Sequence, residues 1–185
     1  MFNLIKSIKK RDPAANNYLE IVLLYPGLHA VCLHRIANLF WIIKLNFIAK
    51  IIAYISRMIT GIEIHPAAKI GKNLFIDHGL GVVIGETSII GNNVLIYHGV
   101  TLGGTSLKKG KRHPTINDYA IIGAGAKILG PITIGRQSRV GANAVVTRNV
   151  ESFTTVMGIP AKVIKKNDNK NFTPYGTPVD LDFNN

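Results

Sequence analysis

An imidazole and two carboxylates stand at spacings that could do chemistry. His78 directly follows Asp77, and Glu63 precedes His78 by fifteen residues. A carboxylate beside an imidazole orients the ring, stabilises its protonated form and leaves the other ring nitrogen as a competent base. A dyad of His78 with Glu63 would suit removal of a proton from a hydroxyl group. The alternative is a structural histidine at a solvated turn, where histidine is common.

A basic, glycine-containing loop forms the second candidate group. Its residues are Lys108, Lys109, Gly110, Lys111, Arg112 and His113, followed by Pro114. The planar guanidinium of Arg112 could hold a carboxylate through two hydrogen bonds while the lysines attract an anionic cofactor. A solvated run of charge is the alternative. The position of Arg112 and His113 directly before a proline favours the binding role.

The other histidines point to no metal site. The six histidines are His29, His34, His65, His78, His98 and His113, and no pair has the close spacing of a zinc motif. We expect His65, followed by Pro66, to cap the entrance of the fold described below, and for His98 both a structural and a functional role remain open.

The element that must position these residues is a repeat of six. Between Ile64 and Val146 an aliphatic residue recurs at thirteen positions: Ile64, Ile70, Ile76, Ile84, Ile90, Ile96, Leu102, Ile116, Ile122, Ile128, Ile134, Val140 and Val146. A period of six fits neither a helix face nor strand alternation, but it fits a coil of three short parallel strands. The sequence therefore predicts a hexapeptide β-helix. A β-rich sandwich with coincidental spacing is the alternative.

The repeat is interrupted twice. The step from Ile76 to Ile84 is eight residues and the step from Leu102 to Ile116 is fourteen, so two residues are added in one place and eight in the other. Inner positions of a coil are committed to packing, so added residues must loop outward, where binding sites are commonly built. Asp77 and His78 fall in the first interruption and the basic loop falls in the second, whereas Glu63 precedes the repeat.

Composition limits the classes of partner. The formal net charge of +12 favours anionic partners, which include nucleic acid, anionic lipid and a phosphorylated cofactor. The basic residues are not interleaved with aromatic residues and no nucleic-acid motif is present, so we expect no nucleic acid. The single cysteine, Cys32, excludes an internal disulfide and suits a reducing cytosol. We expect Cys32 to be a small buried side chain.

The segment before the repeat is apolar but too interrupted to cross a membrane. Its longest uncharged run, residues 21–34, is shorter than the roughly twenty residues of a spanning helix. Residues 1–11 lack the apolar core of a signal peptide. We expect amphipathic helices at about residues 17–24, 27–45 and 48–60, docked on the rest of the protein. A helix lying on a membrane surface is a minor alternative.

The expected organisation has three parts. A helical region covers residues 1–61, a β-helix covers residues 62–164 with a loop at 103–115, and a flexible tail or strap covers residues 165–185. The tail is polar and shows no periodicity.

Beyond the repeat, nine segments carry a more specific pattern. They are Arg11–Ala14, Leu24–Gly27, Gly61–Pro66, Ile76–Gly79, Val83–Thr87, Tyr97–Thr105, Lys111–Pro114, Gly123–Gly130 and Gly158–Ala161. With these segments the chain resembles the serine O-acetyltransferases among the left-handed hexapeptide-repeat acyltransferases, from Arg11 to Lys165. The hexapeptides identify only the superfamily. The Asp-Pro-Ala start, the Asp-His-Gly corner and the Lys-Arg-His-Pro loop identify the serine-specific branch.

The resemblance implies transfer of acetyl from acetyl-CoA to the hydroxyl of L-serine, in cysteine biosynthesis in the cytoplasm. His78 would take the serine proton and later protonate the CoA thiolate. Glu63 stands where many relatives have aspartate, which keeps the charge and changes the reach. The matching also assigns Asp12 and Asp77 to the serine ammonium, and Arg112 with His113 to its carboxylate. Small residues of a cofactor groove would be Gly104, Ala124 and Ala142.

The resemblance further implies left-handed coiling and trimers with active sites between neighbouring subunits. We expect a homotrimer, with a hexamer as the alternative, because only about sixty residues precede the coil. Cysteine is expected as a feedback inhibitor. The chain ends in Asn185 rather than the isoleucine of relatives that bind O-acetylserine sulfhydrylase, which argues against that partner. Two rival functions are a sugar or polysaccharide O-acetyltransferase and a non-catalytic scaffold.

Overall fold

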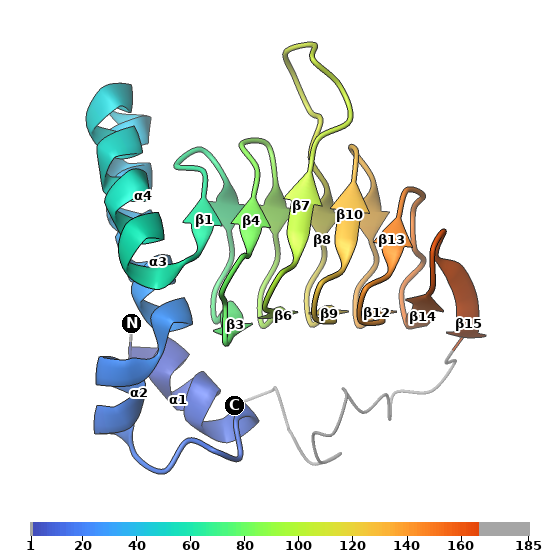
Figure 1. Ribbon diagram of the computed structural model, residues 1–185, viewed down its shortest axis with the longest axis horizontal. Helices are drawn as coiled ribbons and strands as arrows, with labels where there is room; N and C mark the ends of the chain where they lie inside the picture. The colour runs from blue at the N-terminus through green and yellow to red at the C-terminus, as the bar shows by residue number, and fades with distance from the viewer. Residues whose placement is uncertain (1, 167–185) are drawn as a thin grey trace.

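The computed structural model describes residues 2–166. Four helices gather at one end, and a stack of short strands coils away from them along the long axis of the molecule (Figure 1). This arrangement confirms the predicted fold class, a small helical region followed by a parallel β-helix. The sequence-based tail begins at residue 165, but the last strand extends to residue 166. Residues 167–185, with most of the expected tail, lie outside the described part of the chain.

Local sequence sets the ends of the helices. They are α1 (Phe2–Arg11), α2 (Tyr18–Leu24), α3 (Pro26–Ile42) and α4 (Asn46–Thr60). Asn17 caps α2 because its side chain accepts a hydrogen bond from the Glu20 N–H at 2.8 Å. Pro26 begins α3, where its missing N–H costs nothing. α4 stops at Gly61, whose φ of 68° suits glycine.

The first helix was not predicted from the sequence. The three expected helices correspond to α2, α3 and α4, with ends that differ by up to three residues. α1 lies in the segment considered above only as a signal peptide. It buries Leu4, Ile5 and Ile8, and its last turn carries three basic residues, which are favourable at a helix C-terminus.

The strands form three sheets along the coil. They are β1 (Glu63–Ile64), β2 (Lys69–Ile70), β3 (Phe75–Asp77), β4 (Val83–Ile84), β5 (Ile89–Ile90), β6 (Leu95–Tyr97), β7 (Thr101–Gly103), β8 (Thr115–Ile116), β9 (Ile121–Ile122), β10 (Lys127–Leu129), β11 (Thr133–Ile134), β12 (Arg139–Val140), β13 (Val145–Val146), β14 (Thr154–Met157) and β15 (Lys162–Lys166). The first sheet has the order β1-β4-β7-β10-β13, the second β2-β5-β8-β11, and the third β3-β6-β9-β12-β14-β15. All pairs are parallel except β14 with β15.

The core of the coil is made by the residues of the six-residue repeat. All thirteen repeating aliphatic side chains are buried, and ten of them are at most 2% exposed. Small residues two positions before several of them are buried too: Ala68, Ser88, Val94, Ala120, Ala126 and Ala144. Burial of a whole aliphatic side chain stabilises the fold by about 1.5–3 kcal/mol, so this inner column contributes strongly to its stability.

Strand register locates the two insertions. Thr115 pairs with Thr133, so a regular coil takes 18 residues. Glu63 pairs with Val83, a coil of 20, and Thr101 pairs with Lys127, a coil of 26. The differences of two and eight residues confirm the insertion lengths predicted from the sequence.

The insertions leave the coil at different corners. The two-residue insertion follows β3, at the corner where the chain passes from the third sheet to the first, called here the third-to-first corner. The eight-residue insertion lies between β7 and β8, at the first-to-second corner. In Figure 1 this loop projects from the upper edge, beyond the tip of β7, whereas β3 lies along the lower edge. The third-to-first corner and the first-to-second corner therefore lie at opposite edges of the first sheet.

Two arginines fasten the helices to the coil. Arg11, at the end of α1, donates hydrogen bonds to the carbonyl oxygens of Asn73, Asn93 and Val94, and stacks on Phe75. Burial lowers the pKa of Arg11 to about 10. Arg35, on α3, donates to the carbonyl oxygens of residues 70 and 71. These bonds fix α1 and α3 against the first two coils.

Length and apolar composition give no single membrane-crossing helix within residues 2–166. Of the described helices, only α2 and α3 taken together are long and apolar enough to cross a membrane, and they are bent by 65° at their junction.

Candidate active site

The third-to-first corner after β3 has an irregular backbone. His78 has a φ of 58°, a left-handed conformation that costs a non-glycine residue energy. The Gly79 N–H closes a tight turn on the Asp77 carbonyl oxygen at 2.7 Å. His78 and Gly79 are the inserted residues, because Asp77 pairs with Tyr97 and the Gly99 N–H bonds to the Leu80 carbonyl oxygen. The turn exposes the His78 side chain, which is 73% accessible.

Carboxylates gather beside His78. Nε2 of His78 lies 4.0 Å from Oδ2 of Asp77. Burial raises the pKa of the Asp77 carboxyl, His78 opposes that rise, and the negative charge of Asp12 adds to it. The structure thus brings Asp12, from the turn after α1, close to the His78 corner. The arrangement combines two anionic groups with an exposed imidazole, which suits a cationic ligand group and a proton acceptor side by side.

Tyr25 is a further member of this cluster. Its hydroxyl donates a hydrogen bond to Oδ2 of Asp12 at 2.6 Å, and the Ala14 N–H donates to Oδ1 at 2.8 Å. Burial and the Asp12 carboxylate raise the pKa of Tyr25 above its ordinary value. No role was predicted for Tyr25 from the sequence, because its place between α2 and α3 follows no repeat.

His98 lies next to His78 along the coil. The two rings meet edge to face, with centroids 5.7 Å apart and an interplanar angle of 74°. Asp77 and Tyr97 are register partners, so His98 occupies the corner one coil further on. This contact adds His98 to the candidate site.

Glu63 is at the same corner as His78, but its carboxylate has another partner. Arg57, on α4, donates a hydrogen bond to Oε2 of Glu63 at 2.9 Å. A Cβ on Gly79 would lie 2.4 Å from the side chain of Ile62, so the His78 turn packs beside the start of β1. Among residues 2–166, hydrogen bonds do not join Glu63 to His78. The predicted dyad therefore remains a prediction.

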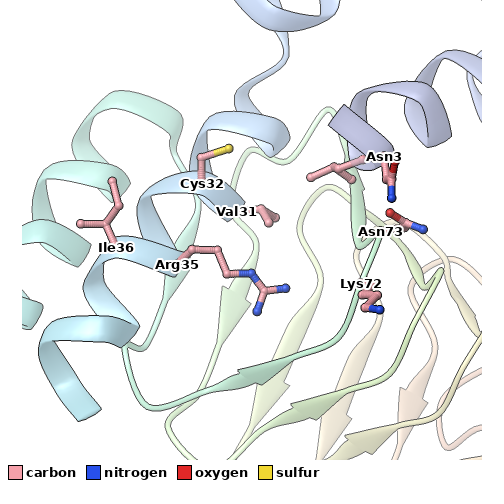
Figure 2. Close-up of a pocket in the computed structure, with 8 residues that line it drawn as sticks. Asn3, Val31, Cys32, Arg35, Ile36, Lys72 and Asn73 are labelled. Atoms are coloured by element: carbon pink, nitrogen blue, oxygen red, sulfur yellow. The ribbon is translucent and has the colours of Figure 1, made fainter. Parts of the chain in front are cut away.

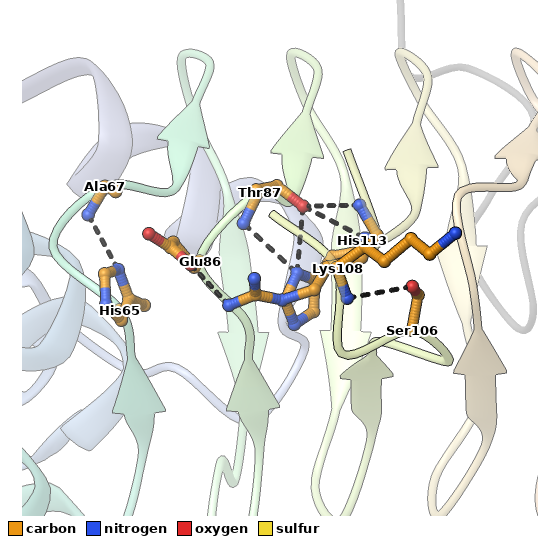
Figure 3. A network of polar contacts seen from close by, with 8 residues as sticks. His65, Ala67, Glu86, Thr87, Ser106, Lys108 and His113 are labelled. Carbon is orange, nitrogen blue, oxygen red and sulfur yellow. Dashed lines mark hydrogen bonds and ion pairs between the residues drawn. The ribbon is translucent and has the colours of Figure 1, made fainter. Parts of the chain in front are cut away.

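Arg112 and His113 stand at the end of the long loop, and the preceding coil holds them. Nη2 of Arg112 pairs with Oε2 of Glu86. Nδ1 of His113 makes two hydrogen bonds with Thr87, one with the backbone nitrogen at 3.2 Å and one with the hydroxyl oxygen at 2.9 Å (Figure 3). Burial is the first cause that lowers the pKa of His113, and the Arg112 charge is the second. This corner combines a guanidinium with an imidazole and suits an anion.

The predicted substrate residues thus form two groups within one chain. Asp12, Asp77 and His78 meet at the third-to-first corner. Arg112 and His113 stand at the first-to-second corner, on the opposite edge of the first sheet (Figure 1). A ligand the size of an amino acid cannot contact both corners of one chain.

A cavity of about 480 Å³ runs along the third sheet. Its lining includes Tyr97, Ala124, Arg139, Ala142 and Met157. Two of the three predicted groove residues, Ala124 and Ala142, line it. Gly104 lies elsewhere, because a Cβ there would be 3.3 Å from Arg112 and His113. Since Tyr97 follows Asp77 in register, the cavity begins one coil from His78.

A second cavity, of about 530 Å³, lies between α1, α3 and the turn after β2 (Figure 2). Cys32, Arg35 and Lys72 are among its lining residues. Cys32 is half-buried rather than fully buried, and burial raises the pKa of its thiol.

His65 contacts both the coil and a helix. Nδ1 of His65 accepts a hydrogen bond from the Ala67 N–H at 3.1 Å, and the ring meets Trp41 edge to face. His65 thus packs where the helices join the coil. Within the described residues, no three His, Cys, Asp or Glu side chains come together as a metal site would require.

Comparison with known proteins agrees with this architecture. The bacterial transferase hexapeptide family (six repeats) matches residues 113–148. A serine acetyltransferase of Bacillus pumilus is 55% identical over 166 residues, which cover 90% of this chain and 76% of that protein. A serine acetyltransferase of Helicobacter pylori is 53% identical over 162 residues, which cover 88% of this chain and 95% of that protein.

Solved structures resemble the chain over nearly its whole described length. They include a Neisseria gonorrhoeae serine acetyltransferase in complex with serine, with a TM-score of 0.84 and 42% identity, which covers 87% of this chain and 66% of that one. A serine acetyltransferase in complex with cysteine has a TM-score of 0.88 and 39% identity and covers 89% of this chain and 64% of that one. A Brucella abortus serine acetyltransferase in complex with coenzyme A has a TM-score of 0.85 and 42% identity and covers 88% of this chain and 65% of that one. The chain thus spans just under two thirds of each solved chain. The identity to these relatives shows that the chain belongs to the serine acetyltransferases, and the hexapeptide coil with its two insertions agrees with this.

Proposed function

We propose that the protein transfers the acetyl group of acetyl-CoA to the hydroxyl of L-serine and releases O-acetyl-L-serine and CoA. The observation that carries this proposal is the inserted corner at His78, where an exposed imidazole stands beside Asp77 and Asp12. Relatives solved with serine, with cysteine and with coenzyme A support it. The net charge of +12 also favours an anionic donor such as acetyl-CoA.

In the proposed reaction, His78 acts as general base and then as general acid. Its imidazole takes the proton from the serine hydroxyl as the oxygen attacks the thioester carbonyl carbon. The tetrahedral intermediate then collapses, the carbon–sulfur bond breaks, and the imidazolium returns the proton to the CoA thiolate. Glu63 would stabilise the imidazolium after exchanging its partner Arg57.

Charge complementarity assigns the ends of serine. Asp12 and Asp77 would bind the ammonium, with Tyr25 holding the Asp12 carboxylate in place. Arg112 and His113 would bind the carboxylate. The acetyl-CoA arm would lie along the cavity of the third sheet, against Ala124 and Ala142. Gly104 would border this arm from the first-to-second corner, beside Arg112 and His113.

A complete site then needs two copies of the chain. We propose a homotrimer in which the first-to-second corner of one copy faces the third-to-first corner of the next. α4 supports this, since it exposes a series of large apolar side chains: Phe47, Ile51, Tyr54, Ile55, Met58 and Ile59. Contiguous apolar surface of this kind marks an interface. A hexamer is the alternative, and native mass spectrometry separates three chains from six.

Cysteine is proposed as a feedback inhibitor because it differs from serine only in having sulfur for the hydroxyl oxygen. It would occupy the same ammonium and carboxylate contacts and compete with serine. The proposed reaction belongs in the cytoplasm, where acetyl-CoA is available. The expectation that O-acetylserine sulfhydrylase is not a partner rests on residues 182–185, which lie outside the described part of the chain.

The test is release of CoA when acetyl-CoA is mixed with serine, threonine, homoserine or a sugar in parallel. The proposal predicts release with serine far above the others. Release with a sugar and none with serine would favour a saccharide acetyltransferase. No release with any acceptor, from folded protein, would favour a non-catalytic scaffold.

A further inference from the structure

Thr87 makes four contacts with Arg112 and His113, at the end of the long loop. Its hydroxyl oxygen accepts hydrogen bonds from the backbone N–H groups of Arg112 and His113, each at 3.0 Å. The same oxygen lies 2.9 Å from Nδ1 of His113, and the Thr87 N–H donates to that nitrogen at 3.2 Å. Figure 3 shows this network, in which one threonine meets both the backbone and the ring.

The network determines which ring nitrogen of His113 carries the proton. A hydroxyl oxygen has two acceptor positions, and the two backbone N–H groups use both. Its hydrogen therefore remains as a donor, and Nδ1 is the acceptor within reach. With the Thr87 N–H also donating to it, Nδ1 must be unprotonated. The neutral ring then carries its proton on Nε2.

Packing holds the ring in this orientation. His113 is 9% exposed, and a Cβ on Gly85 would lie 2.0 Å from Cδ2 and 2.1 Å from Nε2 of the ring. The absence of a side chain at Gly85 thus provides the space for the ring. Nε2 is 3.3 Å from a Cβ built on Gly104, so this edge of the ring faces the loop.

The surroundings disfavour a charge on the ring. Burial lowers the pKa of His113, and the charges of Arg112, His65 and Lys111 lower it further, while Glu86 alone opposes them. A neutral ring near neutral pH has a single N–H to offer a ligand.

Register explains why Thr87 is in place. The coil that contains the long loop takes 26 residues, and 26 residues separate Glu86 from Arg112 and Thr87 from His113. The loop therefore leaves the coil and returns so that its last two residues stand one layer above Glu86 and Thr87.

We infer that Thr87 is a positioning residue for the substrate carboxylate. It holds the backbone of Arg112 and His113 and fixes His113 as the neutral tautomer whose Nε2–H donates to that carboxylate. Thr87 itself does not touch the ligand. The inference rests on the proposed function for the identity of the carboxylate, whereas the tautomer is a property of the protein alone.

The test uses Thr87→Val, which keeps the shape and removes the hydroxyl, and Thr87→Ser, which keeps the hydroxyl. Thr133→Val is the matched control, because the Thr133 hydroxyl takes no part in the hydrogen bonds among the described residues. Nitrogen-15 NMR of histidine-labelled full-length protein reports the proton position, with His113→Gln to assign the signal. We expect a proton on Nε2 alone in the unaltered protein and in Thr87→Ser, and a mixture of tautomers in Thr87→Val.

Steady-state kinetics provide the second readout. Thr87→Val removes the three hydrogen bonds of the hydroxyl, so we expect it to raise the serine KM about tenfold or more. The acetyl-CoA KM should stay unchanged, and Thr87→Ser and Thr133→Val should resemble the unaltered enzyme. A proton on Nδ1, or a charged ring near neutral pH, in the unaltered protein would overturn the inference. So would a changed tautomer in Thr87→Val with an unchanged serine KM. A protein with the Nε2–H tautomer that fails to acetylate serine would refute the proposed function and leave the tautomer assignment supported.

Discussion

Gly85→Ala should damage serine binding from a position that does not contact the substrate. The added Cβ would lie 2.0 Å from Cδ2 of His113, whereas ordinary contact begins near 3.4 Å. The ring must therefore move by about 1.4 Å, the difference between these distances. Gly85 has no positive φ, so its backbone accepts alanine without strain. The perturbation falls on the ring of His113.

The magnitude follows from the bonds that the shift breaks. Displacement of the ring removes its two hydrogen bonds with Thr87, from the N–H and from the hydroxyl. Each such bond contributes about 0.5–1.5 kcal/mol net. A loss of about 1–3 kcal/mol corresponds to a rise in the serine KM of roughly 5- to 140-fold.

The assay is CoA release at varied serine and at varied acetyl-CoA. Gly103→Ala is the control, because its Cβ would meet only the flexible end of Leu129, at 3.0 Å, and Thr101 beyond. We expect a raised serine KM in Gly85→Ala alone, with an unchanged acetyl-CoA KM and unchanged secondary structure by circular dichroism. An unchanged serine KM in folded Gly85→Ala would refute the reasoning that the seat of His113 controls serine binding.

Further predictions concern the base, the composite site, the anchor of α1 and pH. His78→Ala should lower kcat by about 10²–10⁴ in the CoA-release assay. When His78→Ala and Arg112→Ala chains, each inactive alone, are unfolded and refolded together, roughly a quarter of the sites should combine two intact corners and regain activity; no recovery would count against the two-copy site. Arg11→Met should raise the serine KM and speed hydrogen exchange in α1, because three carbonyl oxygens lose their donor. Burial lowers the pKa of His34 to about 4 from 6.5, so the unfolded chain takes up the proton first. The contribution of neutral His34 to the free energy of unfolding is therefore fully present above pH 6.5 and should fall by about 3 kcal/mol as the pH drops towards 4. Urea unfolding at these pH values measures the loss, and His34→Gln should lack it.

The coil could be predicted in detail because one side chain per strand is dictated by packing. Every aliphatic residue of the repeat is buried, and the interruptions after Ile76 and Leu102 give the coil lengths of 20 and 26 residues. The helices could be predicted less well. α1 was missed because a helix of ten residues depends on tertiary packing, here the burial of Leu4, Ile5 and Ile8 and the bonds of Arg11 to the coil.

The site could be predicted in part. Coil arithmetic explains why Thr87 lies beneath His113, and adding 26 residues to Thr87 would have found it from the sequence. Tyr25 could not be found in this way, because the turn between α2 and α3 follows no repeat. The bond from Arg57 to Glu63 could not be foreseen either, since it depends on how α4 docks on the coil. Side chains supplied by the helices are therefore the part that periodicity does not determine.

The most direct measurement follows the acetyl carbon. The protein is incubated with acetyl-CoA labelled with carbon-13 in the carbonyl group and an equal mixture of serine and a sugar, and the products are identified by NMR. We predict that the label appears as the oxygen ester of serine, at a rate that falls with His78→Ala. Label found on the sugar, or released only as acetate, would contradict it.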